Sequence, residues 1–258
     1  MLPARLLDLN LEYFFREEAF SSIWNEEYNY ELEMKNVELQ PAQSIEEGYN
    51  IVTHKLYISG YRNWIYKDDS KYAVTVYKNG YYIDPSNYTI DFVEGRIIFT
   101  DIYAQTLADI DIITADFWYL YVNIINSYPE EIENNNANYR LPIVCIEGLP
   151  FRYQPYELGN AKGNFRRQYL IHILANDDME RDNLMNIILE HLQREWPLID
   201  YASTSPLNED GSKNTNFVKN EIGHIIFDDI RSDIIRERTP AEIMKHWGYI
   251  NCAVNMYF

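Results

Sequence analysis

The sequence is 258 residues long and strongly acidic, with 40 Asp and Glu against 22 Lys and Arg and a net charge of -18. This charge repels polyphosphates and anionic membrane surfaces, and the sequence has no cluster of basic residues of the kind that neutralises nucleic acid. We therefore expect neither specific nucleic-acid binding nor attachment to anionic membranes. The length suits one large domain or two smaller ones, and we expect two.

The two cysteines and the N-terminal residues indicate a soluble protein made in a cytoplasm. Cys145 and Cys252 each lie in an apolar run, so we expect buried free thiols and not a disulfide. The first residues include acidic groups where a secretory signal needs an apolar core, and no stretch is apolar over the roughly 20 residues that span a bilayer. The 23 tyrosines suit both strands and protein interfaces, and the composition does not decide between these roles.

The N-terminal segment, residues 1–48, is expected to hold a helix followed by an extended stretch. Leu and Phe side chains recur at helical spacing over residues 4–20 and predict a helix with a wide apolar side. Weaker alternation of polar and apolar residues predicts a strand around Tyr28 to Met34.

Residues 49–126 show the two-residue period of strands, which predicts an antiparallel β domain. Asn79-Gly80 follows an alternating stretch that begins at Tyr72, and this dipeptide tolerates the positive φ that a tight hairpin requires. Asp84 to Asn87 predicts a second turn, because proline fixes φ and Asx side chains bond to nearby backbone. Further strands are expected at Tyr88–Phe92, Arg96–Thr100 and Asp109–Tyr121.

Residues 127–140 are polar and are expected to form a linker, followed by an α+β domain over residues 141–258. In this domain we expect a mostly antiparallel sheet flanked by helices, so the fold class of the whole chain is α+β. Asp177 and Glu180 have the order of a capping box and predict a helix start. The other expected elements are strands at Leu141–Glu147, Gln168–Ala175 and Ile199–Tyr201, turns over 151–163, a helix end at Pro197, a polar loop over 202–216, a strand from Glu221, a helix at Thr239–Glu242 and a closing strand at Tyr249–Phe258.

The sequence predicts no catalytic, cofactor or metal site, and we expect a non-enzymatic protein. The five histidines are scattered, and none has the spacing of a zinc ligand set with the cysteines. His172 and His224 lie in apolar strands, where a structural histidine is the expected interpretation. Carboxylate pairs such as Asp109 with Asp111 or Asp228 with Asp229 arise by chance among so many acidic residues. The sequence also lacks a phosphate-binding loop and a serine nucleophile motif.

Phe117, Trp118 and Tyr119 are the interface candidates. Consecutive aromatic residues in a strand point alternately to its two faces, so about half of them are expected to be buried. We favour packing in the core or against a partner protein over stacking on sugar rings.

Two parts of the chain resemble structural proteins of tailed bacteriophages. Residues 74–100, VTVYKNGYYIDPSNYTIDFVEGRIIFT, and the following IDIITADFWYLYV resemble a pattern in which a strand ends in Asn-Gly and a turn glycine leads into an Ile-Phe strand. The second half is similar to tail terminator and neck proteins, where a strand with an arginine precedes an acid-capped helix, an Asp-Tyr return strand and a C-terminal strand. The matching positions are Arg166–Ala175, Asp177–Glu195, Ile199–Tyr201 and Tyr249–Phe258.

The resemblance implies a terminator-like fold for residues 141–258 and a virion structural protein at the neck or tail end, synthesised in the host cytoplasm. It further implies a homo-oligomeric ring, commonly sixfold, that joins the tail tube or sheath to the head. The partners are then other copies of the chain and neighbouring tail or neck proteins, and DNA passes through the lumen without specific binding. A baseplate protein, and a carbohydrate-binding or adhesin module built on the aromatic β domain, are the alternatives.

Overall fold

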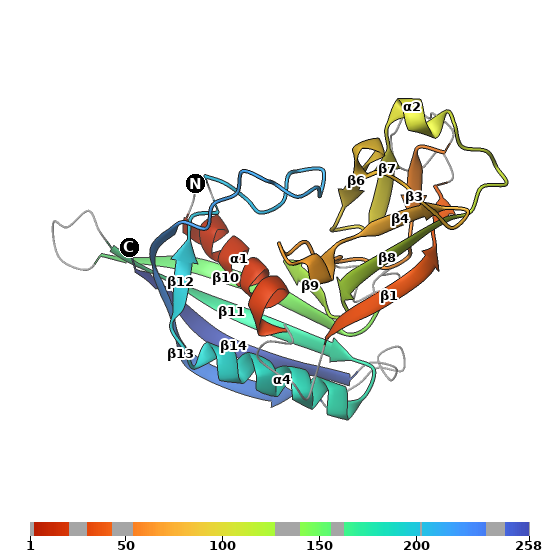
Figure 1. Ribbon diagram of the computed structural model, residues 1–258. Helices are drawn as coiled ribbons and strands as arrows, with labels where there is room; N and C mark the ends of the chain where they lie inside the picture. Colours follow the sequence, from red (N-terminus) through yellow and green to blue (C-terminus); the bar gives the residue numbers. More distant parts are fainter. Residues whose placement is uncertain are drawn as a thin grey trace. The chain divides into compact units, whose positions relative to one another are not determined.

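The computed structural model describes residues 3–20, 30–42, 54–126, 140–155, 163–201, 203–235 and 246–257 (Figure 1). It has the expected α+β class, with an N-terminal helix and mostly antiparallel sheets. The chain divides into two compact units. Unit 1 comprises Met1–Tyr30, Val122–Thr204 and Val218–Phe258, and unit 2 comprises Glu31–Tyr121 and Ser205–Phe217.

This division differs from the expected blocks 1–48, 49–126, 127–140 and 141–258, because each unit is built from separate parts of the chain. The N-terminal helix belongs to unit 1, together with most of the second half. The polar segment 205–217 belongs to unit 2, where Leu207 is buried in the hydrophobic core. Nearly all of the expected linker, residues 127–139, lies outside the described residues.

Unit 1 contains a six-stranded sheet in the order β12-β13-β14-β11-β10-β9. Only the pairing of β9 with β10 is parallel, and the other pairs are antiparallel. The elements of unit 1 are α1 (Pro3–Phe14), a π-helical turn η1 (Phe15–Ala19), β9 (Asn123–Asn126), β10 (Ile143–Pro155), β11 (Gly163–Ala175), α4 (Asp178–Leu192), β12 (Trp196–Ile199), β13 (Glu221–Ile234) and β14 (His246–Tyr257).

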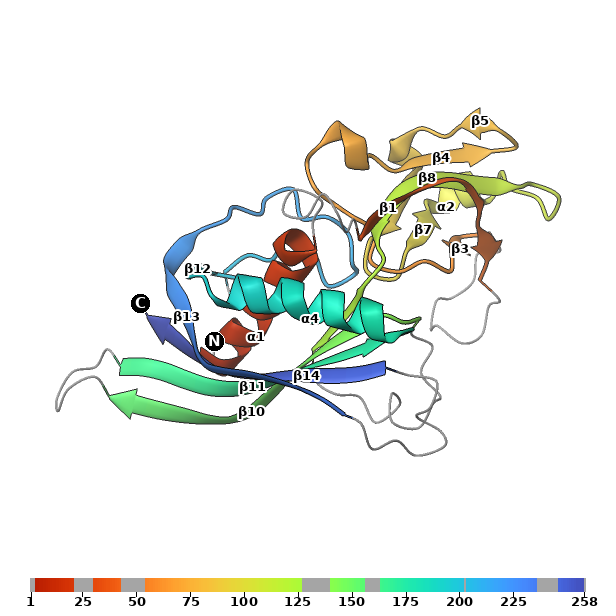
Figure 2. The ribbon, with the colours of Figure 1, turned by 90° about the horizontal axis from the view of Figure 1, so that it is seen from below.

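Helices α1 and α4 pack on the same face of this sheet (Figure 2). Tyr169 of β11 donates a hydrogen bond to Asp8 of α1 over 2.8 Å. Ile173 lies on the same face of β11 as Tyr169 and pairs with Gly248 of β14. A Cβ at Gly248 would lie 2.5 Å from the sulfur of Met185 in α4, so α4 also covers this face.

Helix α4 begins where the capping pattern predicts. The side chain of Asp177 accepts a hydrogen bond from the Glu180 N–H over 2.8 Å, and Glu180 accepts one from the Asn176 N–H, also over 2.8 Å. The Glu180 N–H is one of the first-turn donors that the helix cannot satisfy internally, and the Asn176 N–H belongs to the residue before the N-cap. Pro197 does not end the helix, which stops at Leu192, but lies inside β12, the expected return strand.

The N-terminal segment, α1 with η1, contacts both edge strands of the sheet. The amide of Asn10 accepts from the Ile199 N–H over 2.8 Å and donates to the Ile199 carbonyl over 2.9 Å, as a neighbouring strand would. Arg16 in η1 donates to the carbonyl of Ile124 in β9 over 3.3 Å. Glu12 accepts from Asn126, also in β9. The N-terminal segment therefore covers parts of β12 and β9.

Replacing Asn10 with alanine should lower the free energy of unfolding by about 2 kcal/mol, because the buried N–H and carbonyl of Ile199 would lose their partner. Urea unfolding followed by circular dichroism measures this loss. Asn126→Ala is the matched control, since its side chain bonds a carboxylate and not the backbone of an edge strand. Equal losses for the two variants would contradict the role assigned to Asn10.

Unit 2 consists of two four-stranded sheets, ordered β1-β8-β4-β5 and β2-β3-β7-β6, around one hydrophobic core. In that core the rings of Trp64 and Phe117 stack with centroids 4.0 Å apart. Its elements are β1 (Glu31–Glu38), β2 (Gln40–Pro41), β3 (Leu56–Ile58), η2 (Ser70–Tyr72), β4 (Thr75–Lys78), β5 (Tyr81–Tyr82), η3 (Pro85–Asn87), β6 (Tyr88–Asp91), β7 (Arg96–Phe99), α2 (Asp101–Ala104) and β8 (Ile113–Leu120).

The two turns expected in unit 2 are present, but some strand ends differ from the prediction. The Asn79-Gly80 hairpin joins β4 to β5 with φ angles of 50° and 81°. Asp84 accepts from the Ser86 N–H at the start of η3. Residues 70–72 form a 3-10 turn, so the strand starts at Thr75 and not at Tyr72.

In unit 1, strands β10 and β14 also differ from the sequence prediction. Residues 151–155 continue β10 and are not turns. The C-terminal strand β14 does not close the sheet at an edge, because it lies between β13 and β11. The helix start expected at Thr239–Glu242 lies outside the described residues.

Candidate functional site: a pocket in unit 2

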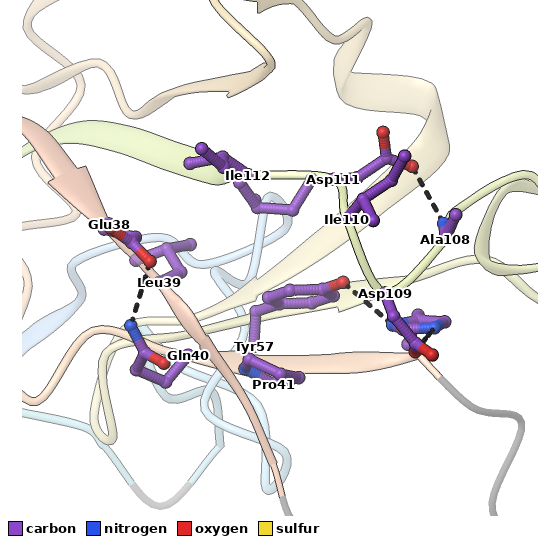
Figure 3. Close-up of a pocket in the computed structure, with 12 residues that line it drawn as sticks. Glu38, Leu39, Gln40, Pro41, Tyr57, Ala108, Asp109, Ile110, Asp111 and Ile112 are labelled. Atoms are coloured by element: carbon purple, nitrogen blue, oxygen red, sulfur yellow. Dashed lines mark hydrogen bonds and ion pairs between the residues drawn. The ribbon is translucent and has the colours of Figure 1, made fainter.

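A pocket of about 390 Å³ opens in unit 2, beside the turn that precedes β8 (Figure 3). Pockets that bind small ligands have volumes of roughly 300–1,000 Å³. Its walls come from the end of β1 and from β2, from residues at the start of β3, and from residues 108–113. The lining residues are Glu38, Leu39, Gln40, Pro41, His54, Tyr57, Ala108, Asp109, Ile110, Asp111, Ile112 and Ile113.

A hydrogen-bonded chain of three side chains crosses one side of the pocket (Figure 3). The Tyr57 hydroxyl lies 3.2 Å from Nδ1 of His54, and Nε2 of His54 lies 3.0 Å from Asp109. Burial, followed by the charges of Asp111 and Asp109, raises the pKa of Tyr57, so this hydroxyl keeps its proton and can donate it. With Nδ1 accepting that proton, Nε2 carries the hydrogen that His54 donates to Asp109.

Asp111 fixes the turn, residues 108–111, that carries Asp109. Its carboxylate accepts hydrogen bonds from the Ala108 N–H and from Asn79, and pairs with Lys78 over 2.9 Å. These hydrogen bonds, led by that from Lys78, lower the pKa of Asp111 to about 2. The turn explains why the expected strand at Asp109–Tyr121 begins only at Ile113, and it leaves the side chain of Ile110 88% exposed.

The arrangement suits binding better than nucleophilic catalysis. Tyr57 is only 2% exposed, and its raised pKa leaves it without the charge that a nucleophile needs. Asp109 and Asp111 do not form a carboxylate pair, because the first bonds His54 and the second bonds Lys78. The pocket therefore offers hydrogen bonds and charge to a ligand.

The interface candidates Phe117, Trp118 and Tyr119 lie in β8 of unit 2. Phe117 is 1% exposed and belongs to the core, which leaves it no surface for a partner. Trp118 is partly covered by the Lys71 amine, 4.4 Å from its ring centroid, and by the edge of Tyr72. Contacts of Trp118 and Tyr119 with a partner protein remain a prediction. Sugar binding remains the alternative, and Lys71 and Tyr72 reduce the surface of the Trp118 ring on which a sugar could stack.

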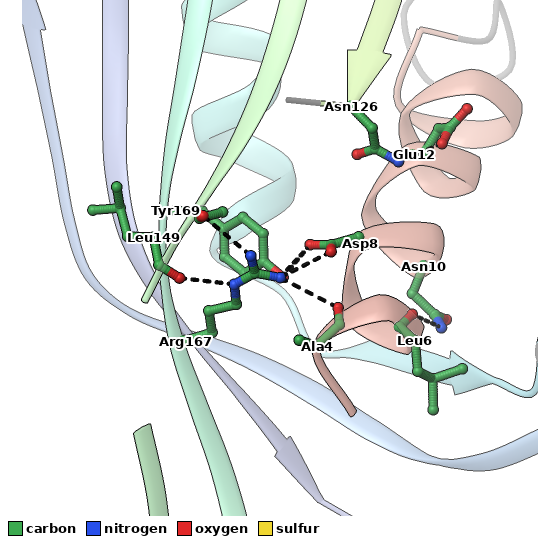
Figure 4. Close-up of polar contacts among 10 residues, drawn as sticks. Ala4, Leu6, Asp8, Asn10, Glu12, Asn126, Leu149, Arg167 and Tyr169 are labelled. Carbon is green, nitrogen blue, oxygen red and sulfur yellow. Dashed lines mark hydrogen bonds and ion pairs between the residues drawn. The ribbon is translucent and has the colours of Figure 1, made fainter. Parts of the chain in front are cut away.

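A second polar cluster joins α1 to the sheet of unit 1 (Figure 4). Arg167 of β11 donates to both oxygens of Asp8, over 2.7 and 2.8 Å. The same guanidinium donates to the carbonyls of Gly148 and Leu149, where a bulge interrupts the pairing of β10 with β11. Burial first, and then Asp8, raises the pKa of Tyr169 well above its ordinary value. Sequence patterns did not reveal this cluster, because Asp8 and Arg167 are far apart in the chain.

The remaining candidate groups serve as structural contacts. Asp228 accepts from Asn255 and Asp229 pairs with Arg166, so the two carboxylates do not act together. His172 bonds Glu147, and the ring of His224 stacks on Tyr257.

Cys145 and Cys252 are buried free thiols, as expected, and burial raises the pKa of each to about 12. Within the described residues no group of three or more His, Cys, Asp or Glu side chains is placed to hold a metal ion.

No protein family model matches the sequence, and no curated protein matches it. Among the helices in the described part of the chain, none combines the length and apolar character needed to cross a membrane.

Proposed function

We propose that this chain is a non-enzymatic structural protein of a tailed bacteriophage particle, located at the neck or tail end. In this role it assembles with other copies into a ring that joins the tail tube or sheath to the head. The proposal combines the sequence resemblance with one structural observation, the arrangement of unit 1.

The arrangement that supports the proposal is a set of four elements in one layered body. Strand β11 with Arg166 and Arg167, the acid-capped helix α4, the short return strand β12 and the C-terminal strand β14 follow one another in the order that the resemblance implies. The three strands belong to the same sheet, and α4 packs on it. The net charge of -18 suits a ring whose lumen DNA crosses without adhering.

Electron microscopy of the purified protein, alone and mixed with purified phage tails, tests the proposal. We expect rings with a central hole, either in solution or at the ends of the tails. In such a ring each subunit contacts its neighbour through two different surfaces, and the ring closes because each subunit is rotated by a fixed angle from the one before. A protein that stays monomeric and ignores the tails would contradict the assignment.

A Trp118→Ala variant tests whether the interface candidates contribute to the ring. Trp118 is only partly buried, so loss of its ring should reduce ring formation about tenfold if it lies in a subunit contact. Tyr81→Ala is the control, because Tyr81 is 80% exposed and outside the aromatic trio. Equal ring formation by Trp118→Ala and the parent would remove Trp118 from the interface.

A further inference from the structure

The pocket in unit 2 carries unbalanced negative charge at its rim. Glu38 bonds the neutral amide of Gln40, and Asp109 bonds His54. Within the described residues neither carboxylate pairs with a lysine or arginine, and no lysine or arginine lines the pocket. By contrast, Asp111 is balanced by Lys78. The electrostatic potential at the rim therefore attracts cations and repels phosphates and carboxylates.

Apolar side chains stand beside these carboxylates. Ile110 is 88% exposed and Ile112 is 52% exposed, and both line the pocket together with Leu39 and Pro41. Isoleucine side chains exposed side by side at a cavity are typical of surfaces that a partner covers. A suitable occupant thus carries a positive charge on an apolar stem.

We propose that this pocket binds a lysine or arginine side chain that a partner protein presents between apolar residues. The basic group would lie between Glu38 and Asp109, its methylene stem would pack on Ile112, and the flanking apolar residues would contact Ile110. This partner chemistry goes beyond the ring assembly and does not depend on it, because it follows from the pocket alone.

The pocket is already arranged for such a ligand. The bond from His54 orients Asp109, and the three contacts of Asp111 hold the turn that carries Ile110. Groups that are fixed before binding lose less conformational entropy when the ligand arrives. Free phosphate or a nucleotide would meet the unbalanced carboxylates of Glu38 and Asp109, so anionic ligands are disfavoured.

The test is a titration of the full-length protein with the peptide acetyl-Leu-Lys-Leu-amide, followed by amide chemical shifts in NMR spectra at low salt. We expect saturable shifts at residues 108–113, with affinity falling at least threefold in 0.5 M NaCl. Two control peptides separate the contributions: acetyl-Leu-Gln-Leu-amide lacks the charge, and acetyl-Gly-Lys-Gly-amide lacks the apolar flanks. Each should bind at least threefold more weakly.

Variants of the protein locate the binding. Glu38→Gln and Asp109→Asn should each lower the affinity for the lysine peptide about threefold, and the double variant should lower it about tenfold. Asp68→Asn, an exposed carboxylate that does not line the pocket, is the matched control and should leave affinity unchanged. Undisturbed spectra of each variant show that it is folded.

Four results would overturn the proposal: no shifts at millimolar peptide, shifts only outside residues 108–113 and the neighbouring strands, equal binding of the glutamine peptide, or equal binding of the glycine-flanked peptide. Equal binding of the glycine-flanked peptide would mean that a bare cation, such as a polyamine, is the occupant, and it would overturn the partner segment proposed here.

Discussion

Replacing Gly95 with alanine should destabilise unit 2 by about 3 kcal/mol or more. Gly95 has a φ of 66°, and a Cβ there would lie 1.7 Å from the carbonyl oxygen of Tyr61, which belongs to backbone and cannot rotate away. The segments on either side are joined by hydrogen bonds from Asn63 to Val93 and from Trp64 to Phe92, over 3.0 and 2.7 Å. Forcing them apart would break these bonds and disturb the buried Trp64 ring.

Gly80→Ala is the matched control for this experiment. Gly80 also has a positive φ, of 81°, but nothing lies within 4 Å of its added Cβ. Alanine there should cost only the backbone term, about 1 kcal/mol. Urea unfolding, with hydrogen exchange of the amides in unit 2 as the readout, measures both variants. If Gly95→Ala loses no more stability than Gly80→Ala, the close approach of Gly95 to Tyr61 does not contribute to the free energy of unfolding.

Replacing Arg167 with methionine should lower the stability of unit 1 by about 3 kcal/mol. Methionine keeps much of the apolar stem but removes the donors to Asp8 and to the carbonyls of Gly148 and Leu149. Asp8 would then be a partly buried carboxylate without its cation, a situation that costs more than the ion pair itself contributes.

The neighbouring Arg166 provides the control for Arg167. Arg166 pairs with Asp229, whose side chain is 62% exposed, and exposed ion pairs contribute little to stability. Arg166→Met should therefore change the free energy of unfolding by less than about 0.5 kcal/mol in urea titrations. Similar losses for the two methionine variants would show that the Asp8 cluster is not what holds α1 on the sheet.

Local signals in the sequence predicted local structure well. The start of α4 follows from Asp177 and Glu180, which bond to backbone groups only a few positions away. The Asn79-Gly80 hairpin follows from the positive φ that those two residues tolerate. Each of these features depends on residues close together in sequence, so the sequence contains most of the information needed.

Features that depend on distant pairs were not predicted. Asn10 and Ile199 are 189 positions apart, and Arg167 and Asp8 are 159 apart, so no window of the sequence contains both partners. The pocket in unit 2 has the same origin, because Glu38, His54 and Asp109 come from separate parts of the chain. The strand predicted from Asp109 begins only at Ile113. The Ala108 N–H bonds the side chain of Asp111, and this local hydrogen bond favours a turn although the residues alternate as in a strand.

The contacts of α1 and η1 with the two edge strands also limit how copies of the chain can join at those edges. The N–H and carbonyl of Ile199 already bond Asn10, and the carbonyl of Ile124 already bonds Arg16, so a second molecule that paired with the sheet at these groups would have to displace those contacts. The N-terminal segment thereby hinders edge-to-edge pairing of molecules at these two residues. Contacts between molecules at these two positions would therefore have to use side-chain surfaces and not backbone pairing.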